Sequence, residues 1–363
     1  MTQHSPADHT PPAPRLLVNS PMEVISARTL VRTATVRHRN VGSLARLDDG
    51  RILLAFRQGT GPLRRNDGAI MLSHSDDDGV SWSEPVPLYA HPGWDCLLMG
   101  GLAHLAGDRL RLILGRVKLD FALGGPEPLS DWYVFAVDSD DGGRTWSDPG
   151  PEIRLFPCWT ELYGTSNPHP LPDGRYLWAC MGTLGRDTGW QAGVTVTGPD
   201  GRDFSPPVII AAAPDRDYAD LDLIRLADGR FLAVIREFVT KESVFSHSAD
   251  DGRTWSPIRP TGFKAANIKL HRLRSGAILC LHRDEDPSRP GVSCHLSKDN
   301  GETWRFAGQL YAAEPGTTYA PGCPCGYPDL VSLEENRLLC VLHTYPDAEG
   351  NVDLHLLHLV DRS

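Results

Sequence analysis

Apolar and polar residues alternate along this chain in pairs of short runs that meet at a tight turn. LARLDDGRILLAF and IRLADGRFLAVI show the arrangement, in which two apolar stretches flank an Asp-Gly pair. Alternation with a period of two around such a pair is typical of two antiparallel strands joined by a hairpin turn. The pattern predicts six hairpins, near residues 43–56, 101–114, 167–180, 221–235, 268–281 and 329–342.

A second phrase, S-x-D-x-G-x-x-W, follows several of these hairpins, and we call its copies boxes. Four boxes are intact, at 75–82, 139–146, 248–255 and 297–304, and a decayed copy lies at 197–204. We expect the Asp to accept backbone N–H groups in a tight turn. We expect the Gly to adopt a conformation that other residues resist, and the Trp to pack between strands. The acidic run at 76–78 lacks the EF-hand spacing, so these turns indicate structure rather than a calcium site.

The repeat sets the expected fold class. Helical periodicity is nearly absent, and short strands at even spacing predict an all-β protein. The boxes recur about every 50 to 60 residues, the period of a propeller blade. Six hairpins then predict a six-bladed β-propeller, a single domain over 15–363, preceded by a flexible Pro-rich tail at 1–14. A short strand at MEVIS is expected to complete the ring beside VDLHLLHLV.

Composition and charge argue against several classes of function. The 363 residues are 40% hydrophobic, with no apolar run near the roughly 20 residues of a membrane helix. The net charge of -10 argues against nucleic acid as a partner. Eight scattered cysteines and the missing signal peptide predict buried thiols in a cytoplasmic protein. The lone C-x-C at 323–325 lacks zinc-site spacing, so no metal or other cofactor is expected.

The boxes resemble the Asp boxes, or BNR repeats, of the sialidase (neuraminidase) superfamily, over about residues 30 to 360. The resemblance implies a sialidase-like glycoside hydrolase that acts on a terminal, acidic sugar. Its site would combine three arginines that clamp a carboxylate, a Tyr nucleophile assisted by an acidic residue, and an Asp acid/base. A neutral Tyr suits an anionic substrate but needs a nearby base, and sialidases are the known Tyr exception among glycosidases.

The resemblance assigns the nucleophile and its partner. The phrase GYPDLVSL places Tyr327 at the position of the nucleophile. In DLDLIRLADG, Asp220 stands where the family has Glu, and Asp222 lies two residues later on the same strand face. The acid/base Asp is expected in the loop after the first hairpin, where Asp67 is the candidate. The alternative is that Asp67 only forms a turn, and its neighbours at 64–65 would lower its pKa.

The three clamp arginines of the family have less clear counterparts in this chain. Arg289 stands eight residues before a box Ser, as the family's third arginine does. Arg236 and Lys241 are both candidates for the second, although Lys supplies a point charge rather than a fork. Arg39 precedes the position of the first arginine by one residue, and Asn40 occupies it. A one-residue slip reverses the face of a strand, unless a bulge compensates.

Polar residues at the equivalent strand starts are expected to line one end of the central channel. They are Ser166, Asn167, His169, Asn267 and Lys269. Trp94 and Asp95 stand at the same place in the second hairpin unit, where Trp94 either stacks on a sugar or packs.

Three functions remain open at this point. A hydrolase predicts that Tyr327, an acidic partner and at least two cations converge on an oligosaccharide or glycoside substrate. A non-catalytic carbohydrate-binding propeller predicts that Tyr327 and Asp220 lie apart in a filled channel. A propeller polysaccharide lyase would use Tyr or His with Arg, and His169 and His343 would then matter.

Overall fold

A computed structural model describes residues 22–29, 38–60, 65–123, 129–162, 166–185, 188–313, 325–344 and 352–363, with only the backbone at 38–41. The N-terminal tail predicted at 1–14 lies outside these residues. The described chain is all-β apart from one short 3-10 turn, η1 (Phe121–Leu123), which confirms the all-β part of the prediction. None of the described helical segments is long and apolar enough to cross a membrane.

The strands form five hydrogen-bonded sheets. The first contains β2 (His38–Arg46), β3 (Ile52–Gly59), β4 (Ala69–Ser75) and β5 (Val86–Ala90). The second contains β6 (Asp95–Ala106), β7 (Arg109–Leu119) and β8 (Leu129–Ser139). The third contains β9 (Trp159–Leu162), β10 (His169–Pro170), β11 (Tyr176–Thr183), β12 (Gln191–Thr197) and β13 (Val208–Ala211).

The remaining two sheets complete the described strands. The fourth contains β14 (Tyr218–Arg225), β15 (Phe231–Glu237), β16 (Glu242–Ser248), β17 (Arg259–Arg272), β18 (Ile278–Asp284), β19 (Gly291–Ser297) and β20 (Arg305–Ala312). The last contains β21 (Gly326–Ser332), β22 (Arg337–His343), β23 (Leu354–Asp361) and β1 (Met22–Thr29). All six predicted hairpins are confirmed as antiparallel pairs, namely β2–β3, β6–β7, β10–β11, β14–β15, β17–β18 and β21–β22.

The fourth sheet has seven strands because β17 belongs to two neighbouring units. Its first half pairs with β16, up to Lys264 opposite Glu242. Its second half, from Ala265 onward, pairs with β18. Six hairpin units therefore share five hydrogen-bonded sheets.

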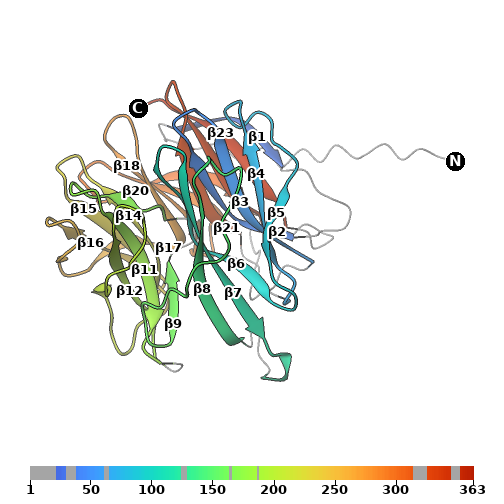
Figure 1. The fold of residues 1–363 in the computed structure, drawn as a ribbon. Helices are drawn as coiled ribbons and strands as arrows, with labels where there is room; N and C mark the ends of the chain where they lie inside the picture. The colour runs from blue at the N-terminus through green and yellow to red at the C-terminus, as the bar shows by residue number, and fades with distance from the viewer. Residues whose placement is uncertain are drawn as a thin grey trace.

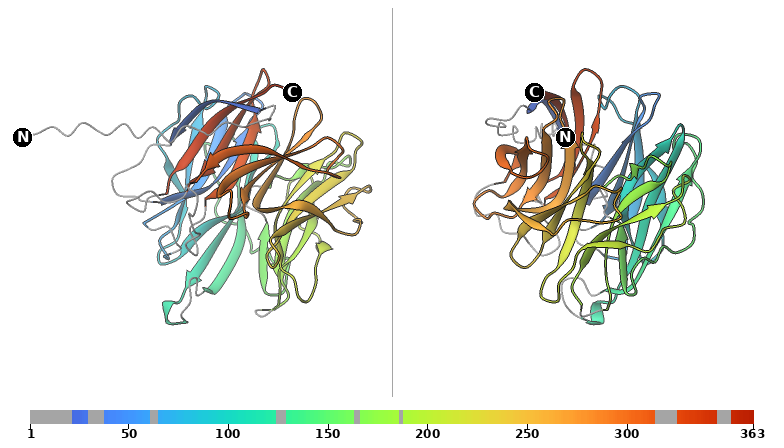
Figure 2. Two further views of the ribbon diagram at one scale, coloured as in Figure 1. Left: turned by 180° about the vertical axis from the view of Figure 1, so that it is seen from behind. Right: turned by 90° about the vertical axis from the view of Figure 1, so that its left-hand side faces the viewer.

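The first and last described strands pair in the last sheet. β1 pairs antiparallel with β23, from Met22 opposite Asp361 to Thr29 opposite His355 (Figure 1). This pairing confirms that the MEVIS segment is a strand beside VDLHLLHLV. Figure 2 shows the last sheet, in red, next to the first strands, in blue.

The four intact boxes share one set of hydrogen bonds. In the first box, Asp77 accepts the Ser81 N–H at 2.7 Å, and the Ser75 hydroxyl accepts the Gly79 N–H at 2.9 Å. The Trp82 indole N–H donates to the Gly79 carbonyl at 3.0 Å. The same bonds recur in the other three boxes. The predicted role of the boxes as structural turns is thus confirmed.

Each intact box also packs against a neighbouring hairpin unit. A Cβ added to a box glycine would lie less than 3.0 Å from a leucine on the second strand of the preceding hairpin; the pairs are Gly143–Leu53, Gly252–Leu177 and Gly301–Leu232. The first box closes the series, because Gly79 meets Leu339 of the last sheet. Packing between sheets therefore continues from the last sheet to the first.

We expect this packing to be measurable at Gly301. Gly301 and Gly229 have nearly equal φ angles, +87° and +89°, but a Cβ would meet Leu232 at 2.6 Å only at Gly301. Gly229→Ala is expected to cost about 1 to 2 kcal/mol from backbone strain alone. Gly301→Ala should cost about 1 to 3 kcal/mol more, because it overpacks the interface. Urea unfolding of both variants tests this, and equal losses would contradict it.

Polar side chains, most of them buried, link the first strands of the hairpins around the centre, and we call them the polar ring. The Ser43 hydroxyl accepts the Leu102 N–H of β6 at 2.9 Å. Asp329 of β21 accepts the Leu44 N–H of β2 at 2.8 Å and pairs with Lys269 of β17 at 2.8 Å. His169 bonds to the Leu223 carbonyl and so links β10 to β14. Asp222 accepts the Leu270 N–H and so links β14 to β17.

Burial of His169 predicts a dependence of stability on pH. Burial lowers the pKa of His169 to about 4, although its bond to Leu223 opposes the shift. Between pH 6.5 and 4 the unfolded chain therefore binds a proton that the folded chain does not, so stability falls as pH falls. Between pH 7 and 4 the wild type should lose about 3 kcal/mol more than His169→Gln, which keeps an N–H donor. Denaturant unfolding at a series of pH values tests this, and parallel curves would contradict it.

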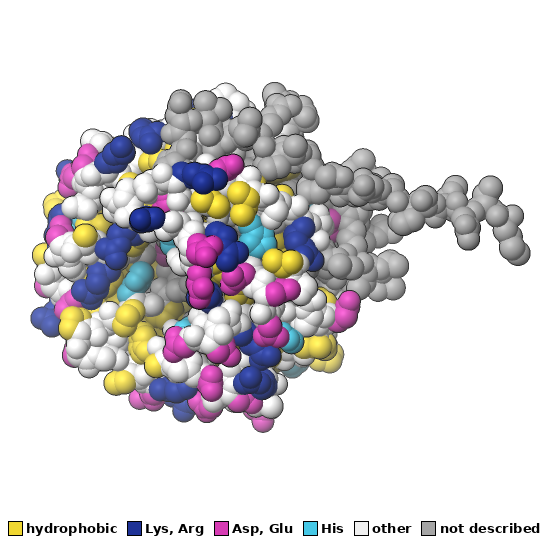
Figure 3. Space-filling view, turned by 90° about the horizontal axis from the view of Figure 1, so that it is seen from above, with side chains coloured by type: hydrophobic (Ala, Val, Ile, Leu, Met, Phe, Trp, Pro, Cys, Tyr) yellow, Lys and Arg dark blue, Asp and Glu magenta, His cyan; other side chains and the backbone are white. Residues whose placement is uncertain are grey.

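The polar ring separates two ends of the molecule. Each hairpin starts at one end, which includes Tyr327, and turns at the other. The first box lies at the turn end, because its Asp78 pairs with Arg337, just after the turn that follows β21, at 2.8 Å. Seen from above, acidic and basic side chains are interspersed on the face shown in Figure 3.

Candidate functional site

Irregular backbone marks the starts of the hairpins, at the end that includes Tyr327. The register shifts between Ala219 and Asp222 in β14, between Ala266 and Lys269 in β17, and between Gly326 and Asp329 in β21. Within these bulges Asp220, Asn267 and Tyr327 have φ angles of +46°, +52° and +46°. Non-glycine residues in this conformation cost about 1 to 3 kcal/mol each and concentrate at functional sites. The fold therefore directs three polar residues to one level of the centre.

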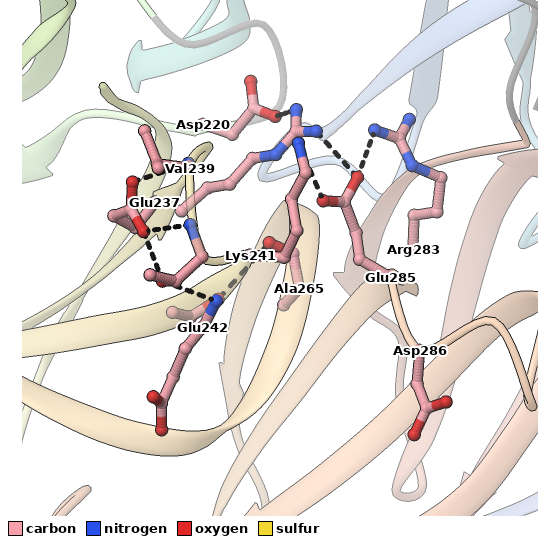
Figure 4. A network of polar contacts seen from close by, with 12 residues as sticks. Asp220, Glu237, Val239, Lys241, Glu242, Ala265, Arg283, Glu285 and Asp286 are labelled. Carbon is pink, nitrogen blue, oxygen red and sulfur yellow. Dashed lines mark hydrogen bonds and ion pairs between the residues drawn. The ribbon is translucent and has the colours of Figure 1, made fainter. Parts of the chain in front are cut away.

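Arg236, at the end of β15, lies between two carboxylates. Its Nη1 donates to Asp220 at 2.8 Å and its Nη2 to Glu285 at 2.7 Å. Its guanidinium also stacks over the Phe238 ring at 3.7 Å. All three charged side chains are less than 10% exposed. Figure 4 shows Asp220 and Glu285 pointing toward the same guanidinium, whereas Asp286 points away.

Arg283, at the end of β18, links this pair to Tyr327. Its Nη1 donates to Asn267 at 2.6 Å and its Nη2 to Glu285 at 3.2 Å. Burial works against its charge, but the electrostatic effects of Glu285, Tyr327 and Asp220 outweigh burial and raise its pKa. The positive charge of Arg283 thus lies within electrostatic reach of both the predicted nucleophile and its predicted acidic partner.

The Tyr327 ring is held on two sides. It stacks on His343 with ring centroids 5.6 Å apart and planes 20° from parallel. It also packs against an apolar cluster that includes Ala219 and Leu221, which flank Asp220. Tyr327 is only partly buried, so the ring is positioned but accessible.

Lys241 adds a third positive charge at the edge of this cluster. It has φ +68° and a 43% exposed side chain, and its Nζ lies 3.9 Å from Glu285. The buried Glu237 shapes its loop by accepting the backbone N–H groups of Val239 and Thr240 at 2.6 and 2.7 Å. The predicted residues Asp220, Arg236, Lys241, Asn267 and Tyr327 are therefore brought together.

Three other predicted residues lie elsewhere. Asp222 and His169 belong to the polar ring, where backbone groups use Asp222 Oδ2 and His169 Nε2. Burial raises the pKa of Asp222, while Lys269 opposes this. Arg289 pairs with Asp284 at 3.1 Å and Asp286 at 3.2 Å. Asp284 alternates with Arg283 and Glu285 along the chain, so Arg289 contacts the opposite side of this segment.

The remaining candidates lie in the first hairpin unit and at the start of the second. The side chain of Arg39 lies outside the described residues, but β2 has the bulge between Asn40 and Gly42 that its prediction required. Asp67 is exposed and accepts the Thr60 hydroxyl. The Asp95 carboxylate is fully buried against Arg57, at 2.7 and 2.8 Å.

Trp94 has an edge-on partner in Tyr133, with ring centroids 5.6 Å apart. Arg116 lies about equally far from both rings, at 5.1 and 5.0 Å. These contacts correspond to the packing interpretation of Trp94.

Sequence reasoning missed Arg283 and Glu285, although the repeat contained the signal for Arg283. Asp220 contacts Arg236, sixteen residues later, and Asn267 contacts Arg283 at the same separation. Tyr327 and His343 are a third pair with this spacing, and they stack. Superposing the hairpins in the sequence would therefore have predicted Arg283 from Arg236. Glu285 has no such counterpart, because it lies beyond the end of its strand.

Comparison with known proteins agrees with this architecture. The family described as BNR repeat-like domain matches residues 121–340, more than half of the chain. The chain belongs to this family, and with it to the sialidase/BNR superfamily. No curated protein matches the sequence significantly.

Solved structures share the fold at low sequence identity. A protein of unknown function from Dyadobacter fermentans has a TM-score of 0.75 at 16% identity, covering 94% of this chain and 99% of that one. The K499G mutant of NanB sialidase from Streptococcus pneumoniae has a TM-score of 0.65 at 12% identity, covering 92% and 70%. The alpha-L-arabinanase of Penicillium chrysogenum, complexed with arabinobiose, has a TM-score of 0.59 at 14% identity, covering 93% and 99%.

Proposed function

We propose that this protein is a sialidase-like glycoside hydrolase, built as a six-bladed β-propeller, with its active site around Tyr327. Six hairpin units, the shared strand β17 and the packing of the first box on the last sheet support the six blades. The sialidase and arabinanase among the similar structures support a glycoside as the substrate.

The observation that carries the proposal is the convergence of charges around Tyr327. Arg283 bonds to Asn267 and Glu285, the negative charges of Glu285, Tyr327 and Asp220 raise its pKa, and Arg236 joins the two carboxylates. This cluster supports the hydrolase hypothesis, in which Tyr327 needs an acidic partner and at least two cations. Three cationic side chains, including Lys241, face two carboxylates, which leaves one net positive charge. This balance favours a terminal sugar with an acidic group.

In the proposed reaction, the Tyr327 oxygen attacks the anomeric carbon and its proton passes to Asp220. The bond from the anomeric carbon to the leaving oxygen breaks, and Asp67 protonates that oxygen. Water then attacks the anomeric carbon, gives its proton to Asp67 and releases the Tyr327 oxygen, which recovers its proton from Asp220. Arg283 favours the negative charge that develops on the phenol oxygen, because opposite charges attract strongly at a buried site.

The test is release of 4-methylumbelliferone from a panel of its glycosides, with the sialic acid glycoside included. We expect the wild-type protein to cleave at least one acidic glycoside. Cleavage of neutral glycosides alone would retain the hydrolase and reject the acidic sugar. No cleavage of any glycoside would reject the proposed function in favour of a carbohydrate-binding propeller or a lyase.

A further inference from the structure

A groove of about 580 Å³ opens beside the decayed box, between the second and third sheets. Its walls come from β7 and β8, from the segment after the second box, and from the decayed box itself. Pockets of 300 to 1,000 Å³ are typical of small-molecule sites. This groove lies at the box end of the molecule, whereas Tyr327 lies at the other end, so the two sites are separate.

The groove adjoins a box whose indole is missing. In each intact box, the Trp N–H donates to the carbonyl of the box glycine. Phe204 occupies the Trp position here and has no N–H. The Gly201 carbonyl accepts Arg111 Nη1 instead, at 2.6 Å. An arginine from the neighbouring sheet thus replaces the indole donor and lines the groove.

The polar side of the groove contains a linked set of charged groups. Asp138 accepts Arg202 Nη2 at 2.8 Å, and Arg111 Nε lies 3.3 Å from its other oxygen. Arg111 is only 7% exposed, and its Nε makes no hydrogen bond of acceptable geometry among the described residues. The Arg111 Nε faces the Asp138 carboxylate, so Arg111 holds this carboxylate in place at the groove.

Another part of the groove lining is apolar. Phe204, Ile153 and Leu155 line it and pack against the core cluster beneath. The Phe204 ring is fixed edge-on to Trp178, with centroids 5.7 Å apart. An aromatic ring in the same groove as forked polar groups matches a sugar ring, which has apolar faces and a rim of hydroxyl groups.

The charges decide which saccharide fits. Three arginines and four acidic side chains line the groove, so their charges nearly cancel. The groove therefore has no net positive charge to attract an anion, whereas the cluster around Tyr327 has one. We propose that this groove binds a neutral saccharide of one or two sugar rings. The binding does not depend on the proposed hydrolase activity.

Ligand-observed saturation-transfer NMR on the full chain tests the site, with lactose, maltose, cellobiose and arabinobiose as probes. The measurements use Tyr327→Phe as the background, so that the proposed hydrolysis cannot remove a probe. We expect saturation transfer to at least one neutral disaccharide. Phe204→Trp, which restores the indole and fills the groove, should raise its Kd by about tenfold or more. Asp138→Asn should do the same, because it weakens the polar side.

Phe306→Trp is the matched control, since Phe306 is 42% exposed on β20, away from the groove. It should leave the Kd unchanged, and circular dichroism should show that all variants are folded. The proposal is overturned if none of the probes binds, or if the Kd is the same in Phe204→Trp, Asp138→Asn and the control. Tighter binding of a glucuronate-containing disaccharide would overturn the preference for a neutral sugar. None of these outcomes tests hydrolysis, so failure here is distinguishable from failure of the proposed function.

Discussion

Replacing Tyr327 by Phe should lower kcat on the cleaved glycoside by about a thousandfold or more, the scale at which a nucleophile is lost. Phe keeps the ring that stacks on His343 and packs beside Asp220, so only the oxygen is removed. The KM should change little, because Arg236 and Lys241 are untouched. Steady-state kinetics on the active 4-methylumbelliferyl glycoside measure both constants.

Tyr89→Phe is the matched control, because Tyr89 lies on β5 and packs edge-on against Phe135. It should retain wild-type kcat. Equal activity in Tyr327→Phe and in this control would remove Tyr327 from the mechanism. A loss confined to KM would instead assign Tyr327 to substrate binding.

Replacing Lys269 by Met should reduce the free energy of unfolding at pH 7 by about 3 to 5 kcal/mol. The Lys269 ammonium lies 2.8 Å from the fully buried Asp329 carboxylate. Burial works against this ammonium, but Asp329 and Asp222 outweigh it and raise its pKa. Without Lys269, two buried carboxylates lose their counter-charge. Guanidinium chloride unfolding measures the loss.

Two variants separate charge from packing in this measurement. Lys264→Met lies on the same strand but at an exposed position, and it should change the free energy of unfolding by less than about 0.5 kcal/mol. Lys269→Met combined with Asp329→Asn should recover part of the loss, because one unpaired charge is removed. If the double variant is no more stable than Lys269→Met, the loss arises from packing rather than charge.

The repeat explains why the hairpins were predictable. A period of two around Asp-Gly fixes a local turn and alternating faces, and neither depends on distant residues. The boxes are local too, since Asp77 bonds to Ser81 within one turn. The number of hydrogen-bonded sheets could not be predicted from the sequence, because it depends on the pairing of β17 with both β16 and β18.

Site residues could be predicted from the sequence only at positions that the repeat or the family motif defines. Tyr327, Asp220 and Arg236 stand at repeat positions that the family motif also marks. Asp222 lies two residues after Asp220, and His169 two residues after Asn167. At this later position the side chain belongs to the polar ring and not to the end of the channel. The bulges decide this difference, and they were not visible in the sequence.

The pairing of β1 with β23 also has a consequence for how the protein is made. Ser26 and His358 bond at 2.9 Å although 332 residues separate them. At about 5 to 20 residues per second, the ribosome needs about 15 to 70 s to bridge that interval. During this time β1 has no partner and the growing array presents an open strand edge, which invites aggregation. The nascent chain is therefore expected to depend on protection by chaperones until its last strand emerges.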